Sequence, residues 1–297
     1  ERLLERLKRE AVTELVGVLS GFWSSIEEQV RLAALAGHDF SAAQEDRVAV
    51  LAAAVQRVVE SGSRIVLCTG RPYPGAKRYM EELGLTQEGD YIINYHGALA
   101  QRTDTGEVVI NHQLTHAEMI EWHKFVESVG VSFQAVREDG VFTEAVDFTP
   151  THLIEPFVNQ MPLHIRTLSE LDSSVLYSKF IMKDAVPLID KLAEAIPNDF
   201  FERFTVIRSM DDSIEVLHKD ASKGRTLKEL AEHLEIPQER VMAIGDSGND
   251  IDMIAYAGLG VAMGNAVPEV LEVADVVTTS NNENGVANAL NRYFFNR

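Results

Sequence analysis

One ten-residue run, from Val241 to Asp250, constrains the fold of this chain more than any other stretch. It begins with four apolar residues, which predict a short buried strand, and continues as Gly-Asp-Ser-Gly-Asn-Asp. Asp246 and Asp250 therefore follow a strand end, where open α/β sheets bind ligands. Carboxylate oxygens at that place suit a hard cation, above all Mg²⁺ beside a phosphate. A single aspartate would more simply cap the helix predicted over 249–257, but the whole run favours the metal site.

Strand and helix signals alternate on both sides of the middle of the chain. The predicted strands cover 65–68, 91–95, 241–244, 260–263 and 275–278, and the predicted helices cover 43–60, 223–234, 249–257, 268–274 and 285–295, with one more ending near Leu83. Such alternation predicts an α/β fold with a Rossmann-like, doubly wound parallel sheet. We assign residues 30–98 plus 218–297 to this core.

Between residues 99 and 217 the rhythm changes to hairpins and separate helices. Turn residues at Asp104-Thr105-Gly106 and Asp139-Gly140 each separate two strand-like runs. A capping box from Thr115 to Glu118 starts a helix. This segment is therefore predicted to be an α+β module inserted into the core as a cap domain.

Residues 1–29 carry apolar side chains at helical spacing and are predicted to form one amphipathic helix, an N-terminal extension of the core. Gly17 and Gly21 weaken this helix by about 1 kcal/mol each relative to alanine. Its apolar stripe favours docking on the chain's own core, and a homo-oligomer or protein-partner contact is the alternative. A strand is predicted over 30–35.

The net charge of −19 argues against nucleic acid or an anionic membrane as the main partner. It remains compatible with a small phosphorylated metabolite held by a few local cations. No apolar run approaches the ~18–20 residues that a membrane span needs. The single cysteine, Cys68, lies in an apolar run and is expected to be a buried small hydrophobe, which fits a reducing cytoplasm.

Two further positions at element ends are suited to phosphate. Thr69 and Gly70 follow the strand predicted over 65–68, where a hydroxyl and backbone N–H groups can hold a phosphate oxygen. Lys223 opens a predicted helix, and its ammonium can neutralise a phosphate or a neighbouring carboxylate. Taken singly, Thr69 would be a strand residue and Lys223 a solvated lysine, but their order on this fold favours one common site.

The motifs Leu67-Cys68-Thr69-Gly70-Arg71-Pro72, Ser222-Lys223-Gly224 and Gly245 to Asp250 resemble the haloacid dehalogenase superfamily, and more narrowly the Cof-type sugar-phosphate phosphatases with an α/β cap. The resemblance covers roughly residues 30–297. It implies phosphate binding by Thr69, Gly70, Lys223 and Asn249, Mg²⁺ binding by Asp246 and Asp250, and a cap that selects the substrate.

One departure from the resemblance concerns the reaction itself. The family's first motif, Asp-x-Asp-Gly-Thr, supplies a nucleophile and an acid/base at the end of the first strand, whereas residues 1–38 contain no aspartate. With the first strand over 31–35, the nucleophile position is Ala36 and the acid/base position His38, and a shift by one gives Gly37 and Asp39. Neither alanine nor glycine can form an aspartyl-phosphate, and one Mg²⁺ ligand is lost as well.

The histidines give weaker signals. His96 stands where the family usually has asparagine, and we expect it to be a turn residue. His112, His116, His123, His152 and His164 lie at spacings that form no helical zinc site, so they are interpreted as scattered surface or core residues.

Three functions remain open from the sequence. The first is a phosphate-binding relative in which hydrolysis is impaired or lost, whether naturally or by deliberate change. The second is an active Mg²⁺-dependent phosphatase in which Asp39, His38 or a metal-activated water replaces the nucleophile. The third is a non-catalytic interaction or regulatory protein that uses the same scaffold.

Overall fold

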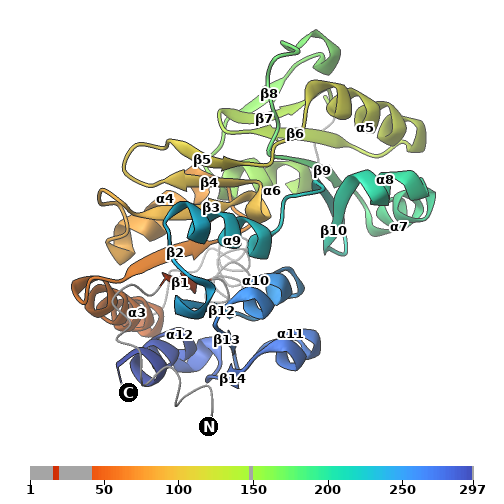
Figure 1. Cartoon of the computed structure of the whole chain (residues 1–297). Helices are drawn as coiled ribbons and strands as arrows, with labels where there is room; N and C mark the ends of the chain where they lie inside the picture. Colours follow the sequence, from red (N-terminus) through yellow and green to blue (C-terminus); the bar gives the residue numbers. More distant parts are fainter. Residues whose placement is uncertain (1–15, 20–41, 147–149, 296–297) are drawn as a thin grey trace.

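The computed structural model describes residues 16–19, 42–146 and 150–295, which form two sheets with helices packed on them (Figure 1). An eight-stranded sheet forms the core and a six-stranded sheet forms the cap. The predicted α/β class with a parallel core sheet is confirmed. Among the described helices, none combines the length and the apolar character that a bilayer crossing requires.

The core sheet has the order β14-β13-β12-β1-β2-β3-β4-β5. Its strands are β1 (Val16–Leu19), β2 (Arg64–Cys68), β3 (Tyr91–Asn94), β4 (Leu99–Arg102), β5 (Val108–Asn111), β12 (Val241–Gly245), β13 (Leu259–Ala262) and β14 (Val276–Val277). The strands from β14 to β3 pair in parallel, and β4 and β5 extend the sheet as antiparallel strands. The carboxyl ends of β2 and β12, which precede Thr69 and Asp246, therefore lie at the same edge of the sheet.

Helices cover both faces of the core sheet. Alternate residues of β2 supply the two sides, with Ile65 and Leu67 in one apolar cluster and Val66 and Cys68 in the other. The first cluster is covered by α3 (Ala42–Glu60), α4 (Tyr73–Leu83), α12 (Gly285–Ala289) and the π-helical turn over Leu290–Phe295. The second is covered by α9 (Lys223–His233), α10 (Ile251–Tyr256) and α11 (Pro268–Val273). A strand buried on both faces reads as a continuous apolar run, as β2 and β12 do.

Cys68 is buried as predicted. Burial is the largest influence on this thiol and raises its pKa far above the ordinary value, so it remains a neutral, apolar group.

The prediction of one helix over residues 1–29 is wrong at Val16–Leu19, because these residues form strand β1 between β12 and β2. Its register sets Leu19 level with Ile244 on one side and with Leu67 on the other. Val16 and Val18 are β-branched and Gly17 is a poor helix former, so the gain from pairing with two parallel neighbours outweighs a weak helical pattern. The position of the first strand in the core sheet, which is predicted above for residues 31–35, is occupied by β1. Residues 1–15 and 20–41, with the remaining part of that helix and the predicted strand over 30–35, lie outside the described residues.

The hairpin predicted after residue 98 forms, but it extends the core sheet as β4 and β5 instead of starting the cap. The turn between β3 and β4 contains His96 and Gly97, and it folds the chain back against its own sheet. The crossing into the cap therefore follows Asn111, and the return follows β11 at His218.

The cap sheet has the order β10-β11-β9-β6-β7-β8. Its strands are β6 (Phe133–Arg137), β7 (Gly140–Thr143), β8 (Leu163–Ile165), β9 (Lys179–Lys183), β10 (Phe204–Met210) and β11 (Ser213–His218). Its helices are α5 (His116–Val129), α6 (Pro150–Val158), α7 (Val186–Ala195) and α8 (Asn198–Arg203). The predicted capping box of α5 is present.

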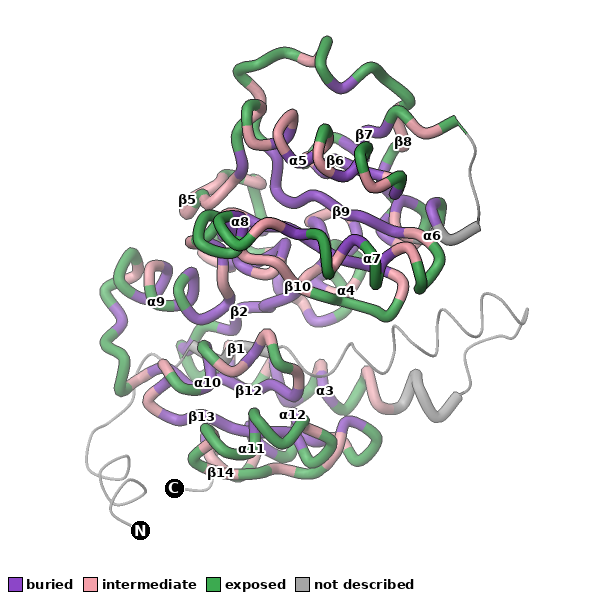
Figure 2. Tube along the Cα trace, turned by 90° about the vertical axis from the view of Figure 1, so that its right-hand side faces the viewer, coloured by how far each residue is buried: buried purple, intermediate pink, exposed green. Residues whose placement is uncertain are grey.

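The two faces of the cap sheet differ. Phe180 and Met182 of β9 join the apolar cluster under α5, α7 and α8. Ile181 instead joins a cluster that contains Tyr95 and Leu99 of the core. Because side chains alternate along a strand, Lys179 and Lys183 share the core-facing side with Ile181. Figure 2 shows β9 of the cap and β12 of the core drawn mainly as buried, whereas α11 carries many exposed residues.

Candidate functional site

The loop after β12 folds tightly around Asp250. The carboxylate of Asp250 accepts hydrogen bonds at Oδ2 from the backbone N–H groups of Asp246 and Ser247, each at 3.0 Å. A Cβ on Gly245 would lie 2.6 Å from the Asp250 Cβ, so only glycine lets the side chain turn back against the strand. Asp250 is fully buried, and its first role is to hold this loop.

Lys223 is brought to the same loop by the start of α9. Ser222 caps this helix, since its side chain accepts the Arg225 N–H at 3.1 Å. The buried ammonium of Lys223 donates to Asp250 Oδ1 at 2.7 Å and to Asn249 Oδ1 at 3.2 Å. Burial opposes its charge, but the Asp250 carboxylate more than offsets this and raises the pKa of Lys223 above its ordinary value. The ammonium therefore stays charged.

Asp246 is the carboxylate better suited to a cation. Its Oδ2 accepts from Asn265 Nδ2 at 2.8 Å and its Oδ1 from Ser247 Oγ at 3.1 Å, and neither donor is charged. Burial, and after it the charge of Asp250, raises the pKa of the Asp246 carboxyl. A divalent cation would compensate the buried charge, and an oriented carboxylate fits Mg²⁺ as a ligand. Asp250 fits less well, because both its oxygens already accept from protein donors.

Thr69 and Gly70 join this cluster through His96. The backbone N–H of His96 donates to the Thr69 carbonyl at 3.1 Å, and the Thr69 hydroxyl accepts the backbone N–H of Arg71 at 3.2 Å. A Cβ on Gly70 would lie 2.3 Å from the His96 ring, so Gly70 makes room for the imidazole. His96 has the positive φ of a turn residue, 57°, as expected, and Asn249 Nδ2 lies 2.9 Å from its Nδ1.

The same imidazole connects the core to the cap. His96 Nε2 lies 3.4 Å from Glu215 Oε2 on β11. Glu215 is also 2.8 Å from Lys179 Nζ, and Lys179 reaches Glu155 on α6 at 3.2 Å. Side chains from both domains thus form one polar chain from the Lys223 cluster to the cap sheet.

The charges of this cap pair are mutually stabilised. Burial opposes the charge on Glu215, but Lys179 and His96 more than offset it and hold the pKa of this carboxyl below its ordinary range. Burial likewise opposes the charge on Lys179, and Glu215 with Glu155 raises its pKa instead. Both groups therefore stay ionised near neutral pH and present a polar surface to the core.

The structure brings together Asp246, Asp250, Lys223 and Asn249, and it connects Thr69 and Gly70 to them through His96. Ala36, Gly37, His38 and Asp39 lie outside the described residues. Glu215 and Lys179 were not predicted from the sequence. A lysine at each end of the apolar run Phe180-Ile181-Met182 was the available signal, but the partners depend on strand pairing.

Gly97 controls where Lys223 stands, which gives a first prediction. It has φ 98°, and a Cβ there would lie 2.3 Å from the backbone oxygen of Ser222, the residue that caps α9. Overpacking and backbone strain together should make Gly97→Ala at least about 2 kcal/mol less stable. Urea unfolding measures this, with Gly248→Ala as the control, because a Cβ at Gly248 meets nothing within 4 Å. Equal unfolding free energies for the two variants would contradict the close approach.

Comparison with known protein families gives a consistent result. Residues 48–290 match the family model described as haloacid dehalogenase-like hydrolase. The protein named "Putative phosphatase YxeH" from Bacillus subtilis is 42% identical over 229 residues, which cover 77% of this chain and 85% of that relative. The protein named 5-amino-6-(5-phospho-D-ribitylamino)uracil phosphatase YitU, also from Bacillus subtilis, is 27% identical over 256 residues, which cover 81% of this chain and 88% of that relative.

Solved structures agree with the sequence relatives. The crystal structure of a haloacid dehalogenase-like hydrolase from Bacteroides thetaiotaomicron superposes with a TM-score of 0.78 at 25% identity. The match covers 94% of this chain and 98% of that one, so it includes both the core and the cap.

Proposed function

Because this chain belongs to the haloacid dehalogenase-like hydrolases, we propose that it binds small phosphorylated metabolites at the Asp246–Lys223 cluster, with hydrolysis impaired or lost. The observation that carries the binding proposal is the buried Lys223 ammonium, held charged between Asp250 and Asn249 beside the loop that follows β12. A fixed cation at the carboxyl edge of a parallel sheet is suited to a phosphate dianion.

Each residue of the cluster has a proposed role. Lys223 and the Asn249 amide bind phosphate oxygens, and Thr69 with the Gly70 backbone N–H binds the phosphate from the end of β2. Asp246 holds Mg²⁺, which neutralises phosphate charge when bound. Asp250 positions Lys223 and the loop, and its buried hydrogen bonds support this role over that of a direct metal ligand.

The cap supports a polar substrate. Its core-facing side carries Lys179 and Glu215, which stay charged, and Gln134 on β6 shares the same side by register with Ile181. Charged and polar groups on the cap face that packs against the core favour a hydroxylated or otherwise polar metabolite over an apolar one. The substrate name of the relative YitU, a phosphorylated ribitylamino compound, is of this class.

The proposal of impaired hydrolysis depends on the first strand. The resemblance implies an aspartate directly after that strand, and the residues that follow β1 in the sequence are Ser20, Gly21 and Phe22. No aspartate precedes Asp39 in this chain, so the nucleophile position lacks an aspartate whether the first strand is β1 or residues 31–35. Loss of a covalent nucleophile costs roughly 10⁴–10⁶ in kcat in comparable enzymes.

Active phosphatase function is the second candidate, favoured by the 42% identity to a relative with a phosphatase name. It requires another nucleophile, for which Asp39, His38 or a metal-activated water are the candidates. The two proposals share the phosphate pocket and differ in turnover.

Calorimetric titration with inorganic phosphate tests the pocket. We expect binding that strengthens when Mg²⁺ is present and a loss of that strengthening in Asp246→Asn, because the amide cannot supply the anionic oxygen. Asp252→Asn is the matched control, since Asp252 lies exposed on α10, two residues after Asp250. If Asp246→Asn and Asp252→Asn respond alike to Mg²⁺, the metal role of Asp246 is wrong.

A further inference from the structure

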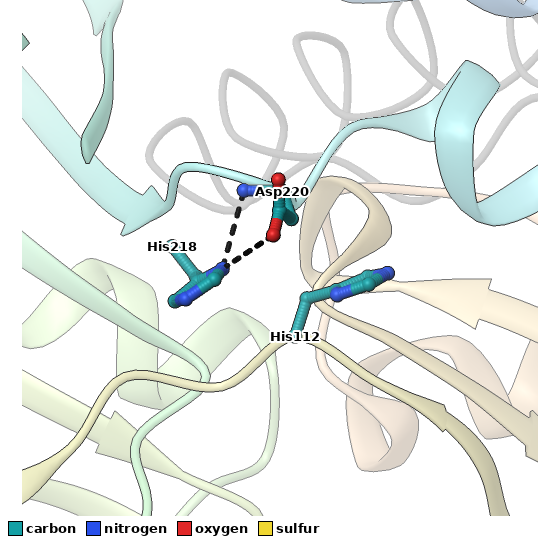
Figure 3. A group of neighbouring side chains, drawn as sticks. All are labelled: His112, His218 and Asp220. Atoms are coloured by element: carbon teal, nitrogen blue, oxygen red, sulfur yellow. Dashed lines mark hydrogen bonds and ion pairs between the residues drawn. The ribbon is translucent and has the colours of Figure 1, made fainter. Parts of the chain in front are cut away.

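The two chain crossings between core and cap bring a histidine of the first crossing next to a histidine and an aspartate of the second. His112 directly follows β5, on the way into the cap, and His218 ends β11, on the way out. Asp220 lies two residues further along the return segment. Figure 3 shows the three side chains converging from these two crossings. One ligand atom of each residue lies within 4.8 Å of the other two.

The imidazole of His112 is already oriented as a metal ligand would be. Its Nε2 lies 2.6 Å from Glu229 Oε2 on α9. In a neutral imidazole this contact is made by a proton on Nε2, which leaves the lone pair on Nδ1. Figure 3 shows one ring nitrogen turned toward Asp220 and His218 and the other turned away. A carboxylate that holds the distal N–H of a ligating histidine is a recurrent feature of metal sites.

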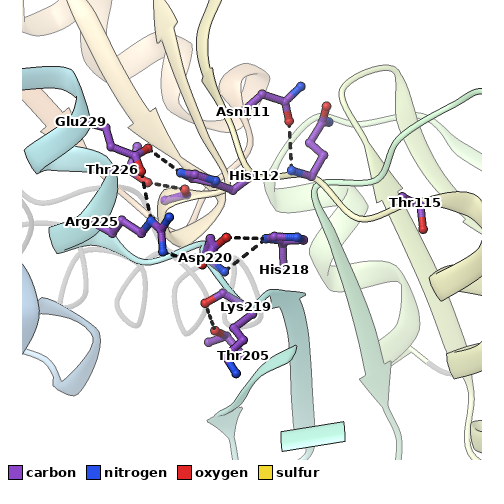
Figure 4. Close-up of polar contacts among 12 residues, drawn as sticks. Asn111, His112, Thr115, Thr205, His218, Lys219, Asp220, Arg225, Thr226 and Glu229 are labelled. Atoms are coloured by element: carbon purple, nitrogen blue, oxygen red, sulfur yellow. Dashed lines mark hydrogen bonds and ion pairs between the residues drawn. The ribbon is translucent and has the colours of Figure 1, made fainter. Parts of the chain in front are cut away.

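His218 and Asp220 offer matching donor atoms. His218 Nδ1 accepts the Asp220 backbone N–H at 3.2 Å, and Asp220 Oδ2 lies 3.9 Å from the same nitrogen. The other Asp220 oxygen, Oδ1, is held by Arg225 of α9 at 2.5 Å, as Figure 4 traces. The rings of His112 and His218 lie nearly parallel, at 13°, with centroids 6.3 Å apart.

We propose that His112, His218 and Asp220 form a site for a divalent transition metal, with Zn²⁺ as the best-fitting ion, at the hinge between core and cap. Two imidazole nitrogens and one carboxylate oxygen suit zinc better than Mg²⁺, which prefers oxygen ligands. Ligand atoms of a tetrahedral zinc ion lie about 3.3 Å apart, so the three groups close on the ion by side-chain rotations, in which His218 gives up the hydrogen bond that its Nδ1 accepts from the Asp220 backbone N–H. A fourth position stays open for water, because these side chains are partly exposed.

The consequence is mechanical. The cap is joined to the core through the segment after Asn111 and the segment after His218, and a cation bound by both segments would join them to each other. The cap would then keep one orientation over the Asp246–Lys223 cluster. This site is distinct from that cluster, because none of its ligands belongs to the loop after β12.

Cobalt titration tests the proposal, since tetrahedral Co²⁺ absorbs visibly and zinc displaces it. The unmodified chain is titrated in saturating Mg²⁺, which occupies the Asp246 site. We expect one equivalent of Co²⁺ with a tetrahedral spectrum, and a loss of affinity in His112→Gln, His218→Gln or Asp220→Asn that exceeds the roughly tenfold effect expected for Glu229→Gln. His233→Gln is the matched control, because His233 is exposed and lies at the far end of α9.

Thermal unfolding gives a second readout that needs no spectrum. Zn²⁺ should raise the melting temperature of the unmodified chain and of Asp246→Asn, and it should not raise that of His218→Gln. Equal Co²⁺ spectra and equal zinc shifts in the unmodified chain and in His218→Gln would overturn the proposal. So would a signal that disappears in Asp246→Asn and persists in His112→Gln, because the ion would then lie at the phosphate cluster.

Discussion

Replacement of Lys223 by methionine should destabilise this chain by about 3–5 kcal/mol, because it leaves the Asp250 carboxylate buried without its cation. The two side chains are 5% and 1% exposed, and their atoms lie 2.7 Å apart. The hydrogen bonds that Asp250 accepts from two backbone N–H groups remain, but these groups carry no full charge. The same change should abolish binding of inorganic phosphate. Urea unfolding and phosphate titration measure the two effects.

Lys228→Met provides the matched control on the same helix. Lys228 is 56% exposed and lies 3.9 Å from Glu232, so its loss should change stability by less than about 0.5 kcal/mol. The double variant Lys223→Met/Asp250→Asn should recover part of the loss, since the stranded charge is removed. If Lys223→Met costs no more than Lys228→Met, the buried ion pair does not organise the site.

Lys179→Met is the second large effect and concerns the cap. Lys179 is 2% exposed between Glu215 and Glu155, and its removal should also cost about 3–5 kcal/mol, because it leaves the buried Glu215 carboxylate without its ammonium partner. Lys191→Met on α7 is the control, because that lysine is exposed. Equal losses in the two variants would contradict a structural role for the pair.

The pH dependence of this loss follows from the direction of the two shifts. In the unmodified chain the pKa of Glu215 is lowered, so its stabilisation is present above the ordinary glutamate pKa and is lost only as pH falls through the lowered value. The pKa of Lys179 is raised, so its contribution is lost only as pH rises through that higher value. In Lys179→Met, buried Glu215 can take up a proton in acid. The deficit should therefore be constant around neutrality and shrink toward low pH.

Short motifs next to strongly apolar strands were predictable from the sequence. Each of these motifs, the run after β12 and the residues after β2, follows four consecutive apolar residues and contains or adjoins a glycine, which marks the end of a buried strand. Because parallel strands end at one edge of a sheet, a common site for Asp246 and Thr69 followed from topology. Lys223 opens a helix after the cap, and its place in the same site followed from the family resemblance.

Features that depend on pairing partners were not predictable. The residues Val16–Leu19 carry a weak helical pattern, and only the place between β12 and β2 makes them a strand. The hairpin of β4 and β5 was predicted to begin the cap, because hairpins occur in both domains and the local sequence does not show which strand a hairpin pairs with. The contact of His112 with His218 joins residues on two separate crossings, so no local spacing announces it.

The different roles of the two aspartates were likewise not predictable from the sequence. Asp246 and Asp250 are equivalent as residue types at a metal-like spacing. The structure separates them, because Asp250 turns back onto the backbone N–H groups of its own loop and onto Lys223. Asp246 accepts hydrogen bonds from two neutral side chains, those of the adjacent Ser247 and of the distant Asn265.

The central claim is a phosphate pocket without ordinary turnover, and phosphate release from a panel of sugar phosphates in Mg²⁺ tests it most directly. Three proteins are compared: the unmodified chain, Asp246→Asn, and Ser20→Asp/Phe22→Asp, which supplies two carboxylates directly after β1. We predict that the unmodified chain releases phosphate no faster than Asp246→Asn and more slowly than the variant with the added aspartates. Turnover by the unmodified chain at about 1–10³ s⁻¹, abolished in Asp246→Asn, would contradict the account.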